Sequence, residues 1–391
     1  MKRSGNIVYL DNAATTFPKP REVVNETARC IRQFCGNPGR ASHAISMKAA
    51  DAVFQCRSSL ASLFGGKEEN VIFTSSATHS LNLGIKSLLH RGDHVLISDI
   101  EHNSVIRPIS ALAKRGLITF DVYEASSDPV TAVGNVSAHL KPNTAMVIAC
   151  HHSNICNLIQ PIQEIGELCR RKGIIFLVDA AQSAGILDID IDRDNVDVLC
   201  APGHKGLYGI PGSGFVLFGD TAFREERPVS TFIEGGNGVR SLDDSMPDFL
   251  PERLEAGTLA VPAIRALSAG VSFVKKRGIK EIERRERELF KLTERGLARF
   301  GDIVTVYGDG EAGGILLFSS PAMPSERIAA ALDRYGICVR AGFHCAPTAH
   351  KRLGTPEEGA VRVSFGAFNT QKEVFYFLNV LDHLLKAGKH L

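Results

Sequence analysis

Short apolar runs alternate with helical patterns between about residues 48 and 220. Six runs of this kind are NVIFT (70–74), HVLIS (94–98), TAMVIAC (144–150), GIIFLVD (173–179), VDVLCA (196–201) and GFVLFG (214–219). Several are apolar throughout and rich in Val and Ile, which is typical of strands buried on both faces of a parallel sheet. Helical segments such as QEIGELCRRK (163–172) separate them. The alternation predicts a doubly wound, mostly parallel α/β domain.

The pattern changes after EAGTLAVPAI (255–264). A long, charge-rich helical stretch at about 262–299 precedes the runs IVTVYG, GILLFSS, GICVRAG and AVRVSFG, with helices expected near 324–335 and 370–387. Fewer strands with helices on one side predict a smaller C-terminal α+β domain. A chain of 391 residues is also long for a single core. We therefore predict an N-terminal arm (1–25) that packs with the small domain or at a dimer interface, a large domain (26–260) and a small domain (261–391).

Composition excludes several classes of partner. The formal net charge is +2 and 23% of residues are charged, so neither nucleic acid nor a membrane surface is indicated. We find no apolar run long enough to span a bilayer and no signal peptide in MKRSGNIVYLDNAATT, so a cytoplasmic location is expected. The nine cysteines are scattered and form no CxxC pair, which indicates neither a disulfide framework nor a zinc ribbon.

Polar side chains follow five successive predicted strands. In open α/β sheets ligands bind at the carboxyl ends of the strands. The residues at these ends are Ser75 to His79, Asp99 to Asn103, His151 to Asn154, Asp179 with Gln182, and His204 with Lys205. Together they predict one polar pocket.

The residue types in this pocket suit pyridoxal 5′-phosphate. Small hydroxyl residues at a helix start can bind a phosphate, and a carboxylate can hold a protonated ring nitrogen. A histidine can stack on the ring, and a desolvated lysine can form an imine with an aldehyde. Asp179 and Lys205 lie about one strand-and-helix unit apart, so neighbouring strands would present them to the same ring.

Other interpretations of these residues are weaker. GHKG (203–206) lacks the Gly-Lys-Ser/Thr ending of a Walker phosphate loop. A solvated lysine on a turn is the plain alternative, and the residues at the other strand ends favour the imine. We interpret His151 and His152 as ordinary strand-end histidines. HHSNIC (151–156) and FHC (343–345) have no recognised ligand spacing, so no metal site is predicted.

Eight ordered motifs span nearly the whole chain: SATHSLN (76–82), EH (101–102), SN (153–154), VDAAQ (178–182), GHK (203–205), EAGT (255–258), GFHCA (342–346) and VRVSF (361–365). With YLDNAATT (9–16), they make the chain resemble fold-type I pyridoxal-phosphate enzymes of the class V aminotransferase group, and the cysteine desulfurases in particular. For the cofactor, the resemblance implies Lys205 as the imine lysine, Asp179 on the ring nitrogen, Gln182 near the ring oxygen, His102 stacked on the ring, and Thr78, Ala77 and His204 at the phosphate.

The same resemblance implies a substrate site and a partner. Asn154, Arg362 and Asn12 would bind the substrate, and the two-pronged guanidinium of Arg362 suits a carboxylate. Asn154 is also expected near the cofactor. Thr258 would reach the cofactor phosphate of a partner subunit, so a homodimer is expected.

The role of Cys345 distinguishes the candidate functions from one another. It lies in VRAGFHCAPTAHKRLG (339–354), whose composition suggests a loop with positive neighbours that favour a thiolate. In the family, a cysteine here takes sulfur from L-cysteine as a persulfide and passes it on. The form of the motif resembles the second group of desulfurases, which often use a sulfur-acceptor protein. This chain departs from the family at Pro202, where a hydroxyl residue is usual, and at Phe343, where histidine is usual.

The predicted function is a pyridoxal-phosphate-dependent cysteine desulfurase that converts L-cysteine to L-alanine. Three alternatives stay open at this point. A selenocysteine lyase acting on L-selenocysteine would share every residue named. Another class V activity, such as an aminotransferase or epimerase, would not use Cys345. A cofactor-binding scaffold in a sulfur-trafficking complex would not turn over.

Overall fold

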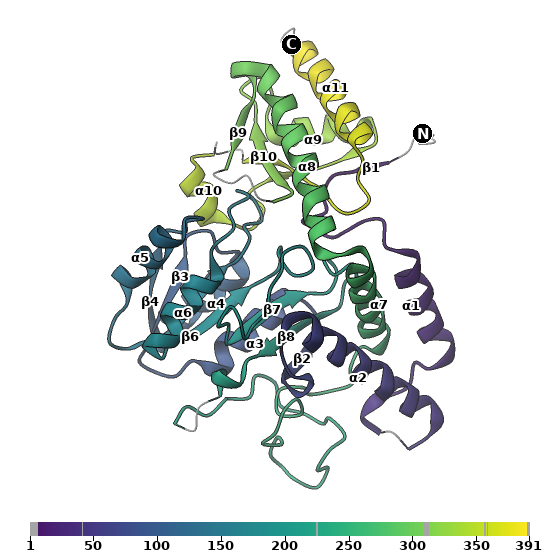
Figure 1. Cartoon of the computed structure of the whole chain (residues 1–391), viewed down its shortest axis with the longest axis vertical. Coiled ribbons are helices and arrows are strands. Elements are labelled where there is room, and N and C mark those ends of the chain that lie inside the picture. Colours follow the sequence, from purple (N-terminus) through teal and green to yellow (C-terminus); the bar gives the residue numbers. More distant parts are fainter. Residues whose placement is uncertain are drawn as a thin grey trace.

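A seven-stranded sheet organises the large domain of the computed structural model (Figure 1), which describes residues 7–40, 42–223, 226–308, 313–355, 357 and 359–388. Within this sheet β8 runs antiparallel to β2 and β7, and all other neighbours are parallel. In spatial order the strands are β2 (Val71–Thr74), β8 (Gly214–Phe218), β7 (Val198–Pro202), β6 (Ile175–Asp179), β5 (Thr144–Cys150), β3 (Asp93–Ser98) and β4 (Ile118–Tyr123).

The central strands are buried on both faces. In β6, Phe176 and Val178 point into one hydrophobic core, while Ile175 and Leu177 point into the other. The first core is completed mainly by α2 (Ala44–Phe64), α5 (Pro129–His139), α6 (Ile162–Lys172) and α7 (Val261–Arg277). The second is completed by α3 (Ala77–Leu88) and α4 (Asn103–Lys114). This two-sided cover explains the continuous apolar runs and confirms the predicted doubly wound sheet.

One strand of the sheet has no counterpart in the sequence prediction. β4 reads ITFDVY and lies at the edge of the sheet, where only its first and last residues are buried. A half-exposed edge strand does not form a continuous apolar run. Apolar runs in the sequence therefore do not predict β4.

The small domain is built on a four-stranded antiparallel sheet in the order β12 (Arg340–Gly342), β13 (Ala360–Ser364), β10 (Ile315–Ser319) and β9 (Thr305–Tyr307). Its hydrophobic core is shared with α8 (Ile279–Leu297), α9 (Ser325–Arg334) and α11 (Gln371–Gly388). A short helix, α10 (Pro347–Leu353), follows β12. This arrangement confirms the predicted α+β domain.

The long helix expected at 262–299 is two helices. Gly278 has φ +86° and lies between α7 and α8. This backbone conformation favours glycine and ends a helix. The break lets α7 pack on the large sheet while α8 continues into the small domain (Figure 1).

The N-terminal arm joins the two domains. β1 (Val8–Tyr9) pairs with β11 (Ile337–Cys338) of the small domain, and α1 (Arg21–Gln33) packs along α7. Between them, Thr16 bonds to the loop that follows β7. The exact boundaries of the three predicted parts stay a prediction. In the described ranges, we find no helix with the length and apolar character that a membrane span requires.

Candidate active site

Lys205 lies three residues beyond the end of β7, on the glycine-rich loop. It is partly buried, and this burial lowers the pKa of Lys205 to about 8. The positive charge of Arg362 acts in the same direction, and the negative charge of Asp179 opposes it. A substantial fraction of the amine is therefore neutral near physiological pH, as imine formation requires.

Asp179 ends β6, the neighbour of β7 in the sheet. Its side chain is buried, with Oδ1 accepting a hydrogen bond of 2.9 Å from the amide of Ala181. Burial raises the pKa of Asp179, while that hydrogen bond and the charge of Lys205 lower it. A buried carboxylate with so few protein donors gains most from a cationic partner, and a protonated ring nitrogen would be one.

The helix α3 begins at this same edge of the sheet. Ser76 caps it by accepting from the amide of His79 at 3.2 Å, so the amides of Ala77 and Thr78 in the first turn stay available to bind an anion. The hydroxyl of Thr78 lies 2.8 Å from that of Ser104. This end of the site can hold an anion.

His204 faces the same space as α3. Its Nδ1 is buried and has no hydrogen-bond partner among the described residues. Burial, assisted by the charges of Lys205 and Lys19, lowers the pKa of His204 to about 4. An unpartnered buried nitrogen beside a helix N-terminus fits a site for a phosphate group.

His102 caps the helix α4. Its Nδ1 accepts from the amide of Ser104 at 3.1 Å, which fixes the orientation of the ring. Burial lowers the pKa of His102 to about 4, and the positive charge of Lys205 adds to this effect. The ring is therefore neutral and can lie flat on an aromatic ligand.

One cavity of about 120 Å³ collects most of the predicted residues: Ala77, Thr78, His102, Asn154, Asp179, Gln182, His204 and Lys205. Pro202 also lines it, at the position where the family usually has a hydroxyl. The sequence prediction missed Ser104 and Cys150, which line the same cavity, as does His152, a strand-end residue to which the prediction gave no role. Ser104 bonds to both Thr78 and His102, and its place two residues after His102 was the available signal. No cluster of metal-ligating side chains occurs among the described residues.

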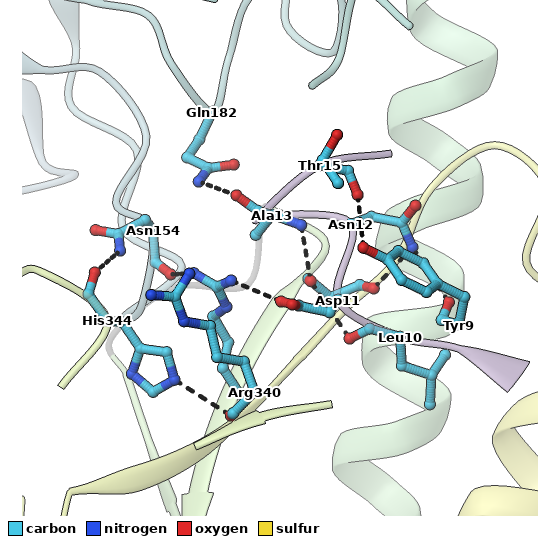
Figure 2. A network of polar contacts seen from close by, with 12 residues as sticks. Tyr9, Leu10, Asp11, Asn12, Ala13, Thr15, Asn154, Gln182, Arg340 and His344 are labelled. Atoms are coloured by element: carbon cyan, nitrogen blue, oxygen red, sulfur yellow. Dashed lines mark hydrogen bonds and ion pairs between the residues drawn. The ribbon is translucent and has the colours of Figure 1, made fainter. Parts of the chain in front are cut away.

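Gln182 and Asn154 form part of the hydrogen-bond network in Figure 2. Gln182 donates to the carbonyl of Ala13 at 3.0 Å, and Asn154 donates to the carbonyl of His344 at 2.9 Å. Asn154 Oδ1 is buried without a partner in the described part of the chain. This side chain therefore joins the cavity to the turn that carries Cys345 and keeps one acceptor free for a ligand.

Arg362, on β13, is 2% exposed and does not line the cavity. It donates to Asp11 Oδ1 at 2.8 Å and to the carbonyl of Asn154 at 3.3 Å, while its buried Nε has no partner in the described ranges. Its charge lowers the pKa of both Lys205 and His102, so the guanidinium lies within electrostatic range of the site.

Two further predicted residues, Asn12 and Thr258, do not line the cavity. The amide nitrogen of Asn12 donates to Ser364 and Asn369 at 3.1 Å each, and its oxygen accepts from Phe17. Since protein partners already use this amide, its predicted substrate contact stays a prediction without geometric support. Thr258 lines a different, larger cavity of about 1220 Å³, so its predicted contact with a partner subunit's cofactor also stays a prediction.

Cys345 lies on an exposed turn between β12 and α10. Its carbonyl accepts a hydrogen bond of 2.8 Å from the amide of Asn103, the first residue of α4 and the neighbour of His102. The turn is thus bonded to the rim of the cavity through both Asn103 and Asn154. Cys35 is also exposed, so exposure alone does not distinguish Cys345 among the cysteines.

Comparison with known proteins decides the family. The model of the aminotransferase class-V family matches residues 8–377. The chain belongs to this family. This result and the relatives described next confirm the resemblance and the fold type inferred from the motifs.

Among curated relatives of this class V chain, a "Probable cysteine desulfurase" of Pyrococcus abyssi is 30% identical over 97% of this chain and 95% of its own length. One from Methanothermobacter thermautotrophicus is 31% identical with the same coverage. A solved cysteine desulfurase from Thermococcus onnurineus has a TM-score of 0.86 at 30% identity, covering 97% of this chain and 95% of the other.

Proposed function

We propose that this protein is a pyridoxal-phosphate-dependent cysteine desulfurase. It would convert L-cysteine to L-alanine and hold the released sulfur as a persulfide on Cys345. The observation that carries the proposal is the joint position of Lys205 and Asp179 in one buried cavity, with the Cys345 turn bonded to its rim. The names of the relatives support the same reaction.

The residues present fit the cofactor. Lys205 would hold its aldehyde carbon, Asp179 its ring nitrogen, and His102 the face of its ring. The unpartnered His204 Nδ1, Thr78 and the first turn of α3 would bind its phosphate. When bound, the cofactor withdraws electrons from the Cα of an amino acid.

The protein's own groups would handle the substrate and the proton. The guanidinium of Arg362 and the free Oδ1 of Asn154 lie on the side of the site that faces the small domain. They would supply the cation that the carboxylate of an amino acid needs and an acceptor for its amine. The Lys205 amine, with its pKa near 8, can take a proton from Cα and return it to carbon.

Cys345 would receive the sulfur. Its thiolate attacks the substrate sulfur, so a sulfur–sulfur bond forms as the substrate Cβ–S bond breaks. The electron pair of the broken bond stays with the carbon, which becomes the methyl group of alanine after protonation. An acceptor thiol, from a partner protein or a small molecule, then removes the persulfide sulfur.

The proposal is tested by incubating the cofactor-loaded protein with L-cysteine and a thiol reductant. Alanine and sulfide are expected in equal amounts, whereas pyruvate with ammonia would contradict the proposal. Lys205→Ala is expected to abolish the visible absorbance of the bound cofactor. Cys345→Ser is expected to keep that absorbance and lose at least about 90% of sulfide release, because serine cannot form a persulfide. Parallel assays with L-selenocysteine separate this activity from a selenocysteine lyase.

The proposal includes a homodimer and a cytoplasmic location. The segment 231–259 carries exposed Ile233, Leu242 and Phe249 and lines the larger cavity that contains Thr258. Exposed apolar side chains beside a concave surface favour a second copy of the chain as the occupant. None of the described cysteines forms a disulfide bond, which suits a reducing compartment, and cell fractionation would test the location.

A further inference from the structure

His344 is buried directly beside the exposed Cys345 and makes three polar contacts, one through its backbone carbonyl and two through its ring. Its carbonyl accepts from Asn154 at 2.9 Å, as described above. Its Nε2 lies 3.2 Å from the carbonyl of Arg340, and its Nδ1 lies 3.3 Å from Nε2 of His350 on α10. His344 therefore connects the Cys345 turn to the cavity, to β12 and to α10.

The proton positions in this network follow from its partners. The carbonyl of Arg340 can only accept, so His344 carries its proton on Nε2. Its Nδ1 must then accept, and His350 must donate from Nε2. The remaining nitrogen of His350, Nδ1, lies 2.8 Å from the hydroxyl of Thr355, whose other acceptor is the carbonyl of His350 at 3.3 Å. Because Nδ1 carries no proton in this arrangement, it accepts the shorter bond from that hydroxyl. The hydroxyl of Thr355 thus stabilises the tautomer that lets His350 bond to His344.

Both rings are held neutral and in contact. Burial lowers the pKa of His344 to about 3 and also lowers the pKa of His350. The two rings are nearly parallel, with centroids 5.5 Å apart and planes 11° apart. The ring of Phe343 meets His350 edge-on at 5.3 Å, which covers the pair on another side.

The backbone of the turn needs such support. His344 has φ +52° and Cys345 has φ +59°, a left-handed conformation that is costly for residues other than glycine. Two consecutive residues of this kind persist only where the surroundings hold them. Here the holding contacts are the carbonyl bonds to Asn154 and Asn103 and the buried ring of His344.

We propose that His350 and Thr355 are positioning residues for the sulfur-accepting Cys345. They fix the tautomer and place of the His344 ring, which keeps the strained turn against the rim of the cavity. Neither residue lines the cavity. The inference rests on the proposed function, in which Cys345 takes the sulfur.

The test compares Thr355→Val with Thr355→Ser. Valine removes the hydroxyl and frees His350 to change tautomer, whereas serine keeps the donor. We expect Thr355→Val to lower kcat for alanine formation about tenfold, the effect of one lost, partly buried hydrogen bond. KM for L-cysteine and the absorbance of the bound cofactor are expected to stay unchanged. Thr355→Ser is expected to remain within about twofold of the parent protein.

The helix α10, which carries His350, offers a matched control. Thr348 on α10 has a buried hydroxyl that lacks a partner among the described residues. Thr348→Val makes the same chemical change seven residues earlier in the chain without touching the network, and no change in kcat is expected. His350→Gln, whose amide can donate from nearly the position of Nε2, is expected to recover most of the activity that His350→Ala loses.

A second readout does not depend on turnover. Hydrogen–deuterium exchange of a peptide covering 341–347 is expected to be faster in Thr355→Val and unchanged in Thr355→Ser and Thr348→Val. Unchanged exchange and kcat in Thr355→Val would overturn this inference and leave the desulfurase proposal intact. Full alanine formation by Cys345→Ser would instead reject the desulfurase proposal, while the exchange data would still test whether the network holds the turn.

Discussion

Glu101 shows how strongly burial near the site changes the pKa of a single side chain. It is fully buried, and its Oε1 accepts from the hydroxyl of Ser98 at 2.6 Å and from the amide of Cys150 at 2.7 Å. Its Oε2 has no partner within the described ranges. Burial raises the pKa of Glu101 to about 8, and the charge of Asp179 adds to the rise. The residue therefore remains protonated behind the cavity at neutral pH.

The raised pKa of Glu101 predicts that the free energy of unfolding depends on pH. In the unfolded chain Glu101 ionises near its ordinary pKa of 4.5, whereas in the fold it keeps its proton up to about 8. Between these values the unfolded state binds fewer protons, so rising pH lowers the free energy of unfolding. Glu101→Gln removes this term, and its Tm relative to the parent protein is expected to rise from pH 5 to pH 8. Calorimetry at both pH values checks this, and an unchanged difference would contradict it.

At the scale of elements, the loop that carries Lys205 is held in place by the helix α7 as well as by the strands β7 and β8 that flank it. Gly270 of α7 lies so close to the loop that a Cβ there would be 2.0 Å from the carbonyl of Leu207 and 2.9 Å from the amide of Gly209. Tyr208, between them, accepts from the amide of Ala367 in the small domain at 2.7 Å. The loop that presents Lys205 is thus placed by contacts with α7 and the small domain.

Gly270→Ala is therefore expected to destabilise the protein by about 1–3 kcal/mol, since the backbone of the loop must move. It is also expected to weaken cofactor binding, measured by titration of the visible absorbance. Gly134→Ala is the matched control, because Gly134 lies in α5 with open space around it. That change is expected to stabilise the protein by about 0.5–1 kcal/mol and leave cofactor binding unchanged. Equal effects of the two substitutions would contradict this account.

At the scale of the whole molecule, the segment 231–259 projects from the large domain, at the bottom of the view in Figure 1. It lines the larger cavity together with α2, including Val53 and Phe54. Leu242 in this segment is completely exposed. A single copy of the chain leaves this surface open, and the proposed homodimer would cover it.

The dimer predicts a molar mass in solution of twice the 42.3 kDa of the chain. The double variant Leu242→Glu, Phe249→Glu would place two negative charges in the proposed interface. Its mass in light scattering is therefore expected to shift towards that of the monomer. Val130→Glu, at an exposed apolar residue of α5 outside the larger cavity, is expected to keep the mass of the dimer. A parent protein of 42.3 kDa would reject the dimer.

The sequence alone determined the sheet and most of the cavity. Buried parallel strands must be apolar throughout, and their carboxyl ends must meet at one edge, so Asp179, His204 and Lys205 could be grouped from their places after apolar runs. The sequence prediction missed the edge strand β4 because its half-exposed residues form no apolar run. It missed the break at Gly278 because the charge-rich helical pattern continues on both sides of this glycine.

Only the tertiary structure decided how the small domain meets this cavity. The bond from Arg362 to Asp11 and the bonds from the Cys345 turn to Asn103 and Asn154 join residues far apart in the chain. Such pairings depend on how two domains pack, and no local pattern encodes them. The network of Thr355, His350 and His344 spans a few residues, yet its proton positions depend on a turn that the packing of both domains imposes.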